Sequence, residues 1–207
     1  MIEPLWNGLR VLAFVEAGSA ELVETGGTTV GRAAIAEAVA RATRASTAVL
    51  DGYLTTEVSR SDVGLAPLAD DGGLSAGDLA RQMLVGGGGN RTRSLVTRAN
   101  EIETSARLAE SALDAAEDAA LVAVDLLELD GESLLDVPLL ERKRLLDAIL
   151  AEEARVRIGI HVRLPIDPWL PTWRMLGIRN IAFKGANSRY RPGEPNDDWA
   201  SAQMPRR

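Results

Sequence analysis

The stretch that decides the fold is LVAVDLLELDG, residues 121–131. Its first part, residues 121–127, is almost wholly apolar and predicts a buried strand, and residues 129–133 predict the turn that follows. Pro138 then favours the start of a helix that runs to about residue 153. The buried side of that helix is expected to carry Leu139, Leu140, Leu145, Leu146, Ile149 and Leu150. A strand, a turn and an amphipathic helix therefore form the centre of the predicted fold.

Further elements are predicted on both sides of this centre. Apolar and β-branched runs predict strands at residues 9–15, 20–23, 47–58, 155–164 and 178–184, with a Gly-Ser turn at 18–19 and a polar tail from Tyr190. Helical spacing predicts one helix over 31–44 and another that begins at Asp167-Pro168 and ends at Gly177. The strands and helices do not alternate strictly, so the predicted class is α+β and not a doubly wound parallel sheet.

Residues 59–118 have a different character. We predict a short helix over 75–84, a linker at the four glycines 86–89, and a longer helix over 100–118 with a thin apolar stripe. The stripe is weaker than a core helix needs. We therefore interpret 59–118 as a mostly helical insertion on the outside of a single domain that spans 1–207.

The composition excludes several classes of protein. The chain has 23 basic and 30 acidic residues and a net charge of −7, whereas general nucleic-acid binders gather positive charge. It has no cysteine and one histidine, which excludes disulfides, thiolate chemistry and a multi-histidine metal site. No apolar run is long enough to span a membrane, and the N-terminus lacks the features of a secretory signal. We expect a cytoplasmic protein with neither a membrane nor free duplex DNA as its partner.

Five segments, in order along the chain, share the motifs of one family. They are EPLWNGLR (3–10), LDGY (50–53), VDLLELDG followed by ERKRLL (124–146), RNIAFK (179–184), and SRYRPG followed by DW (188–199). They resemble the motifs Glu-Pro-Lys-x-Asp-Gly-x-Arg, Leu-Asp-Gly-Glu, Phe-Asp-Leu-Leu-x-Leu-Asp-Gly, Glu-Gly-x-Val-x-Lys and Ser-x-Tyr-x-x-Gly of the adenylation domain of ATP-dependent DNA ligases. The resemblance covers everything except 59–118. It implies the ligase/capping-enzyme nucleotidyltransferase (ATP-grasp-like) fold, with antiparallel sheets flanked by helices.

The resemblance fails at the positions that carry the family's chemistry. In the family a lysine amine attacks the α-phosphate of ATP, and this chain has Leu5 at that position. The family's other acids and phosphate-binding lysines are replaced by Asn7, Tyr53, Arg179, Ser201 and Gln203. The resemblance therefore implies no catalytic residue and no Mg²⁺ site. We also expect no OB-fold domain after residue 207.

Four residues remain candidates for binding a cofactor. Arg10, Asp51 and Lys184 keep the identity that the family motifs require, and Trp6 lies beside residues that line the family's adenine pocket. The cofactor would be ATP or AMP, weakly held.

Some of these residues have a second interpretation. Lys184 is either an anion ligand or a leftover lysine at a strand end, and Arg10 contacts either a phosphate or the acids near it. We expect Lys143 on the solvated face of its helix, and His161 as a core or edge histidine.

Three functions stay open. The first is a non-catalytic protein-interaction or regulatory module with a protein partner or a homo-oligomer, which Leu5 favours. The second is an active ATP-dependent DNA ligase whose nucleophile is unusual, and the third is a structural subunit of a larger assembly. We expect two contact surfaces: an exposed apolar patch of Leu5, Trp6 and Tyr53, and the insertion's stripe of Ile102, Leu108 and Leu113.

Overall fold

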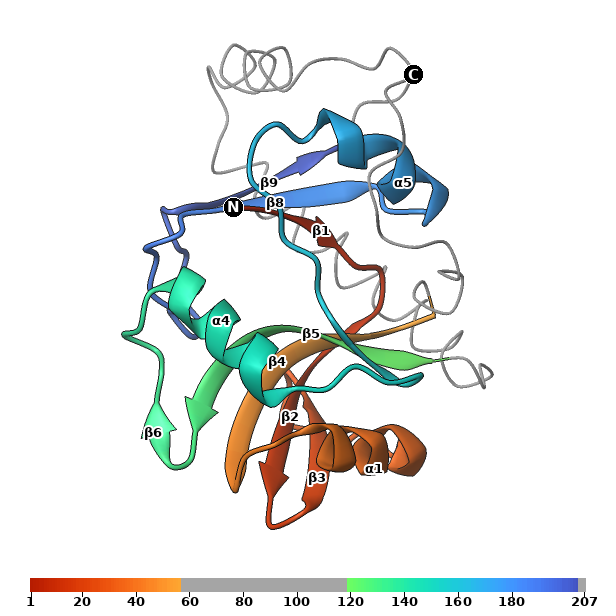
Figure 1. The fold of residues 1–207 in the computed structure, drawn as a ribbon, viewed down its shortest axis with the longest axis vertical. Coiled ribbons are helices and arrows are strands. Elements are labelled where there is room, and N and C mark those ends of the chain that lie inside the picture. The colour runs from red at the N-terminus through yellow and green to blue at the C-terminus, as the bar shows by residue number, and fades with distance from the viewer. Residues whose placement is uncertain (57–118, 205–207) are drawn as a thin grey trace.

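The computed structural model describes residues 1–56 and 119–204, which form two sheets with flanking helices (Figure 1). The larger sheet has the strand order β3-β2-β4-β5-β6, and β7 pairs with β5 in parallel. Its strands are β2 (Leu9–Glu16), β3 (Ser19–Glu24), β4 (Thr47–Thr55), β5 (Ala120–Leu129), β6 (Glu132–Ser133) and β7 (Val156–Ile158). The smaller, antiparallel sheet has the order β1-β8-β9, with strands β1 (Ile2–Leu5), β8 (Asn180–Lys184) and β9 (Trp199–Gln203).

The helices are α1 (Ala33–Ala42), α4 (Leu139–Ile149), the 3₁₀ turn η2 (Asp167–Trp169) and α5 (Leu170–Met175). The predicted α+β class with flanking helices is confirmed, and the predicted antiparallel pairing holds except between β5 and β7, which are parallel. The predicted insertion at 59–118, with its helices and its apolar stripe, lies outside the described residues.

Strand β5 lies between two apolar clusters. Leu121 and Ala123 belong to the cluster that packs under α1, whereas Val122 and Val124 belong to the cluster that contains Trp173 of α5. Neighbouring residues of a strand point to opposite faces, so a strand that is covered on both sides carries apolar residues on both faces. This is why the run at 121–127 lacks polar alternation.

The hairpin of β2 and β3 shows the opposite pattern. Along β2, Val11, Ala13 and Val15 are buried and alternate with more exposed residues. The two strands are joined by Ala17 and Gly18, both with positive φ, as the tight turns that match strand twist require. The turn lies one residue earlier than the predicted Gly-Ser pair, because Ser19 already belongs to β3.

Two strand predictions need correction. The strand predicted over 155–164 is only β7, because after Ile158 the chain leaves the larger sheet and Val162 pairs with Ile2 of the smaller one. The strand predicted over 178–184 is β8, but it is not the last strand. The expected polar tail contains β9, which forms because its backbone bonds to β8 in an unbroken register.

Gly52 is a site where the fold requires glycine. It lies in β4, and a Cβ atom there would come within 2.6 Å of the carbonyl oxygen of Val122. Overpacking a core costs roughly 1–3 kcal/mol, so we expect Gly52→Ala to lower the free energy of unfolding by about that amount in urea denaturation. Gly31→Ala is the control, because nothing lies near its added Cβ. Equal stability of the two variants would contradict the prediction.

Candidate functional site

Three charged side chains form a buried group that we call the glutamate–lysine cluster. Glu3 of β1 lies between Lys143 of α4 and Lys184 of β8, with each ammonium nitrogen 3.3 Å from a carboxylate oxygen of Glu3. The side chains of Glu3 and Lys143 are only 4% and 1% exposed, and that of Lys184 is 12% exposed. Lys143 also donates to the backbone carbonyl of Val124 in β5. The cluster therefore links the two sheets and α4.

Burial and charge act against each other in this cluster. Burial alone would raise the pKa of Glu3, but the ammonium groups of Lys143 and Lys184 outweigh it and the pKa is lowered. Burial lowers the pKa of Lys143, and the Glu3 carboxylate opposes only part of that effect. Glu3 is therefore ionised over the ordinary pH range, and it is the only carboxylate that forms an ion pair with either lysine in the described chain.

A second group joins Arg10 of β2 to Asp51 of β4. The guanidinium donates from Nε at 3.0 Å and from Nη2 at 2.6 Å to the two oxygens of the buried Asp51 carboxylate. The Tyr190 hydroxyl donates to Asp51 at 3.1 Å and accepts from Arg10 at 3.2 Å. The hydrogen bonds that Arg10 donates to the Asp51 carboxylate raise the pKa of Arg10, and burial raises the pKa of Tyr190. Such bidentate, charge-assisted pairs are strong and fixed in geometry.

Trp199 of β9 connects the two groups. The Lys184 ammonium lies 4.5 Å from the centre of the Trp199 ring, a cation–π distance, and Tyr190 meets the same ring edge-on at 5.9 Å. The indole nitrogen of Trp199 donates to Ser188 at 2.7 Å. Charged and aromatic side chains thus form one connected network from Lys143 to Asp51.

A buried ion pair between Arg142 and Asp125 lies next to this network and contacts Tyr190. Arg142 of α4 donates from Nε and Nη2 to the two oxygens of Asp125 in β5, both at 2.8 Å, and neither side chain is more than 1% exposed. A third bond runs from Arg142 to the carbonyl of Val137 at 2.6 Å. The guanidinium carbon also lies 5.8 Å from the centre of the Tyr190 ring. This pair holds α4 and the Tyr190 segment in place.

The structure brings together three of the four residues predicted to bind a cofactor. Arg10, Asp51 and Lys184 all belong to the network, and the interpretation of Arg10 as a partner of nearby acids matches its bond to Asp51. Trp6 lies apart from them. It is 8% exposed and belongs to the apolar cluster around α5.

The burial of Trp6 corrects the prediction of an exposed apolar patch. The patch was expected to join Leu5, Trp6 and Tyr53. Trp6 instead packs into the core and Tyr53 packs against the same cluster, while burial raises the pKa of Tyr53. Leu5, at the end of β1 opposite Asn180, and Tyr53 are partly exposed.

The prediction for Lys143 is wrong. Lys143 was expected on the solvated face of its helix, but α4 packs the side that carries Leu139, Lys143 and Leu146 against the fold. Glu3, Tyr190 and Trp199 were not predicted as parts of the site. The helical spacing indicates that Lys143 is buried, because positions 139, 142, 143, 146 and 149 lie on one face of the helix.

Neither a metal site nor a membrane span is found in the part of the chain that the structure describes. No three histidine, cysteine, aspartate or glutamate side chains in residues 1–56 and 119–204 gather closely enough to hold a metal ion. No helix within the same ranges is long and apolar enough to cross a bilayer.

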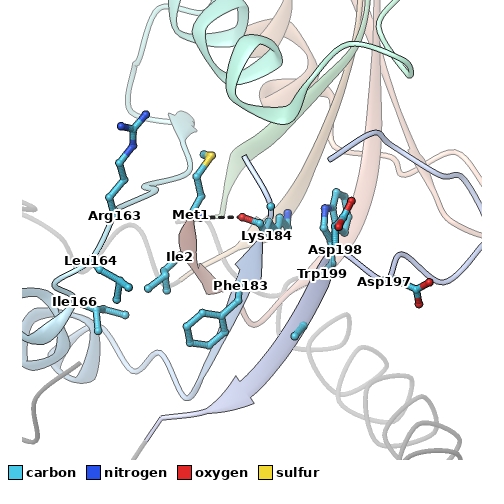
Figure 2. Close-up of a pocket in the computed structure, with 12 residues that line it drawn as sticks. Met1, Ile2, Arg163, Leu164, Ile166, Phe183, Lys184, Asp197, Asp198 and Trp199 are labelled. Carbon is cyan, nitrogen blue, oxygen red and sulfur yellow. Dashed lines mark hydrogen bonds between the residues drawn. The ribbon is translucent and has the colours of Figure 1, made fainter. Parts of the chain in front are cut away.

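A pocket of about 650 Å³ lies at one end of the smaller sheet (Figure 2). Ile2, Ile166 and Phe183 are apolar residues that line it, and Asp198 is an acidic one. Lys184 and Trp199 also line this pocket, so it adjoins the glutamate–lysine cluster. At its edge the Met1 ammonium donates to the Lys184 carbonyl at 2.8 Å.

Known structures share this arrangement of sheets and helices. No protein-family model and no curated protein matches the sequence. The ligase domain of LigD from M. tuberculosis is similar with a TM-score of 0.56 and 20% identity, over 98% of this chain and 52% of that one. Mycobacterial DNA ligase D complexed with ATP and MES gives 0.55 and 19%, over 98% and 53%. A Lig E DNA ligase gives 0.51 and 12%, over 98% and 61%.

These similarities define the fold. The chain has the α+β fold of the adenylation (nucleotidyltransferase) domain of ATP-dependent DNA ligases, as its sequence motifs predict. It spans about half the length of the two ligase D structures that it matches.

Proposed function

We propose that this chain is a non-catalytic nucleotidyltransferase-fold domain that acts in the cytoplasm through contacts with other proteins. The observation that carries the proposal is Leu5, which ends β1 at the position where the sequence resemblance places the nucleophilic lysine. A leucine side chain has no lone pair and cannot attack phosphorus.

The ion pairs of the site support this proposal. Lys143 and Lys184 share the Glu3 carboxylate, and Asp51 holds Arg10 with both of its oxygens. A nucleotide phosphate would have to compete with these carboxylates for the cations. We therefore propose that ATP or AMP binds weakly at most. Arg179, at the metal-associated position of the motif, would repel Mg²⁺.

One observation favours a second function, that of a DNA ligase with an unusual nucleophile. Lys143 is a buried amine whose pKa is lowered by burial, and a lowered pKa is what a nucleophilic lysine needs. However, its ammonium group bonds to both Glu3 and the Val124 carbonyl, and its side chain is 1% exposed. An α-phosphate would have to reach it through these contacts, so we favour the non-catalytic function.

Incubation with labelled ATP and Mg²⁺, followed by intact mass measurement, distinguishes the two functions. We expect neither the wild-type protein nor Leu5→Lys to gain an AMP adduct, because the new lysine would still lack the acids replaced by Tyr53 and Arg179. Lys143→Arg is the matched variant, since it keeps the charge and removes the nucleophilic amine. An adduct on wild-type protein that maps to Lys143 and disappears in Lys143→Arg would establish adenylation through Lys143 and overturn the non-catalytic proposal. An adduct on Lys184 would also overturn the non-catalytic proposal.

A further inference from the structure

Strand β9 forms an open edge of the smaller sheet. At the other edge, the start of β1 is covered by the chain itself, because Ile2 and Val162 exchange backbone hydrogen bonds of 2.9 and 2.8 Å. The outer side of β3 is covered too, by bonds from residues 28–30 to Leu22 and Glu24. β9 pairs with β8, and no other strand in the described part of the chain lies along its outer side (Figure 1).

The register shows which backbone groups face outward. The bonds from Gly185 N to Asp198 O and from Met204 N to Arg179 O continue the pairing of β8 with β9 at both ends. In an antiparallel pair, the groups that point to the neighbour alternate along the strand. The N–H and C=O of Ser201 and Gln203 therefore point away from β8. These groups have no hydrogen-bond partner within residues 1–56 and 119–204.

The side chains of β9 do not protect this edge. Proteins usually protect an edge strand with lysine, proline, an inward charge or a bulge. The strand reads WASAQ, without charge or proline, and it pairs with β8 without a bulge. Ala200, Ser201 and Gln203 are exposed. The edge of β3 differs, since it carries Glu21 and Glu24.

We propose that β9 pairs antiparallel with β9 of a second copy of this chain, around a two-fold axis at Ser201. The interface refines the protein-contact role proposed above. Two copies of a protein with a net charge of −7 repel one another wherever carboxylates face each other, and β9 is an exposed strand that brings no charge to the contact. Its small central residues, Ala200, Ser201 and Ala202, leave room for the second backbone.

The proposed register gives a partner to the N–H and C=O of Ser201 and to the N–H of Gln203. Ser201 pairs with Ser201 of the second copy, so each N–H meets the other's C=O. The Gln203 N–H meets the Trp199 carbonyl of the second copy, while the Trp199 N–H keeps its own bond to Asn196 at 3.0 Å. The two smaller sheets become one continuous sheet, in which both former edges are interior. This is strand addition with a second copy as the added strand.

A proline at the outward-facing position tests the interface in the full chain. Ser201→Pro removes an N–H that does not bond to β8, and proline is tolerated at such edge positions. We expect sedimentation velocity to give twice the 22.1 kDa chain mass for the wild-type protein and for the control Ser201→Ala, and 22.1 kDa for Ser201→Pro with an unchanged circular dichroism spectrum. A monomeric wild-type protein, or a dimer that survives Ser201→Pro, would overturn the proposal.

Two single-cysteine variants test the two-fold pairing of β9 independently, even if the proline variant does not fold. The chain has no cysteine, so Ser201→Cys introduces a single thiol. Residues that exchange both hydrogen bonds have Cα atoms about 5.5 Å apart, within the range that a disulfide bridges. We expect Ser201→Cys to form a covalent dimer on mild oxidation and the control Gln203→Cys, which faces Trp199 of the second copy, to stay unlinked. Equal linking of both variants, or of neither, would refute the two-fold pairing. Neither the sedimentation result nor the cross-linking result depends on adenylation. The β9 dimer and the non-catalytic function can therefore be refuted separately.

Discussion

A Glu3→Gln variant is expected to lose about 3–5 kcal/mol of its free energy of unfolding, because it leaves buried lysines without their counter-charge. Lys143 and Lys184 both make their ion pair with this one carboxylate. The amide retains the shape of the side chain and removes its charge. Two ammonium groups then remain close together, and one of them is 1% exposed. The repulsion between the two ammonium groups and their loss of hydration both destabilise the folded state, so the expected loss of stability is large.

Urea denaturation near neutral pH measures this loss. Glu16→Gln is the matched control, since Glu16 is an exposed glutamate in β2 and such changes usually fall within about 0.5 kcal/mol. Combining Glu3→Gln with Lys143→Met should restore part of the stability, because one of the unpaired charges is removed with it. If Glu3→Gln cost no more than Glu16→Gln, the cluster would not be stabilising the fold.

The contribution of Glu3 to the free energy of unfolding depends on pH, and the shift of its pKa determines whether that contribution is lost in acid or in alkali. The pKa of Glu3 is lowered in the folded protein from an ordinary value of 4.5. The ionised carboxylate therefore stabilises the fold fully above pH 4.5, and the stabilisation is lost as the pH falls through the lower, folded-state pKa. The stability difference between the wild-type protein and Glu3→Gln should be constant above this value and shrink below it. A difference that grows on acidification would contradict the assignment.

Asp125→Asn is expected to be similarly damaging, at about 3–5 kcal/mol, because it breaks a buried bidentate pair from one side. Asp125 accepts two hydrogen bonds from Arg142 and a third from the backbone N–H of Leu126. An amide offers one oxygen, and its NH₂ group would face a guanidinium that can only donate. Arg142 is fully buried and has no second carboxylate within the described chain.

The same helix supplies the control for this variant. Glu141 forms an exposed pair with Arg144 at 3.3 Å, and surface pairs of this kind contribute at most about 1 kcal/mol. We expect Glu141→Gln to unfold at nearly the wild-type urea concentration and Asp125→Asn far below it. Similar midpoints for the two variants would show that burial does not govern the strength of the pair.

The fold could be predicted from the sequence to a large extent, because its main elements have simple patterns. β2 alternates, β5 is apolar apart from Asp125 and Glu128, and α1 carries Ile35, Ala38, Val39 and Ala42 on one face. β9 was missed because small and polar residues form it, and the bonds to β8 that stabilise it connect positions that are not local in sequence.

The site was harder to predict for a different physical reason. Its central residue, Glu3, is charged and lies in a four-residue strand, where nothing local indicates that two lysines will surround it. Lys143 was assigned to solvent because of its residue type, although its helical spacing placed it with Leu139 and Leu146. Burying a lysine is unfavourable unless a partner is present, and that partner comes from the opposite end of the chain.

The position of β5 between the two apolar clusters has a consequence for cooperativity. Each cluster contains alternate residues of this one strand, so neither can lose its packing while the other keeps β5 in place. Local unfolding that begins at α5 would uncover Val122 and Val124 and thereby weaken the strand on which Leu121 and Ala123 depend. We therefore expect the two sheets, although they have separate strand orders, to unfold as a single unit.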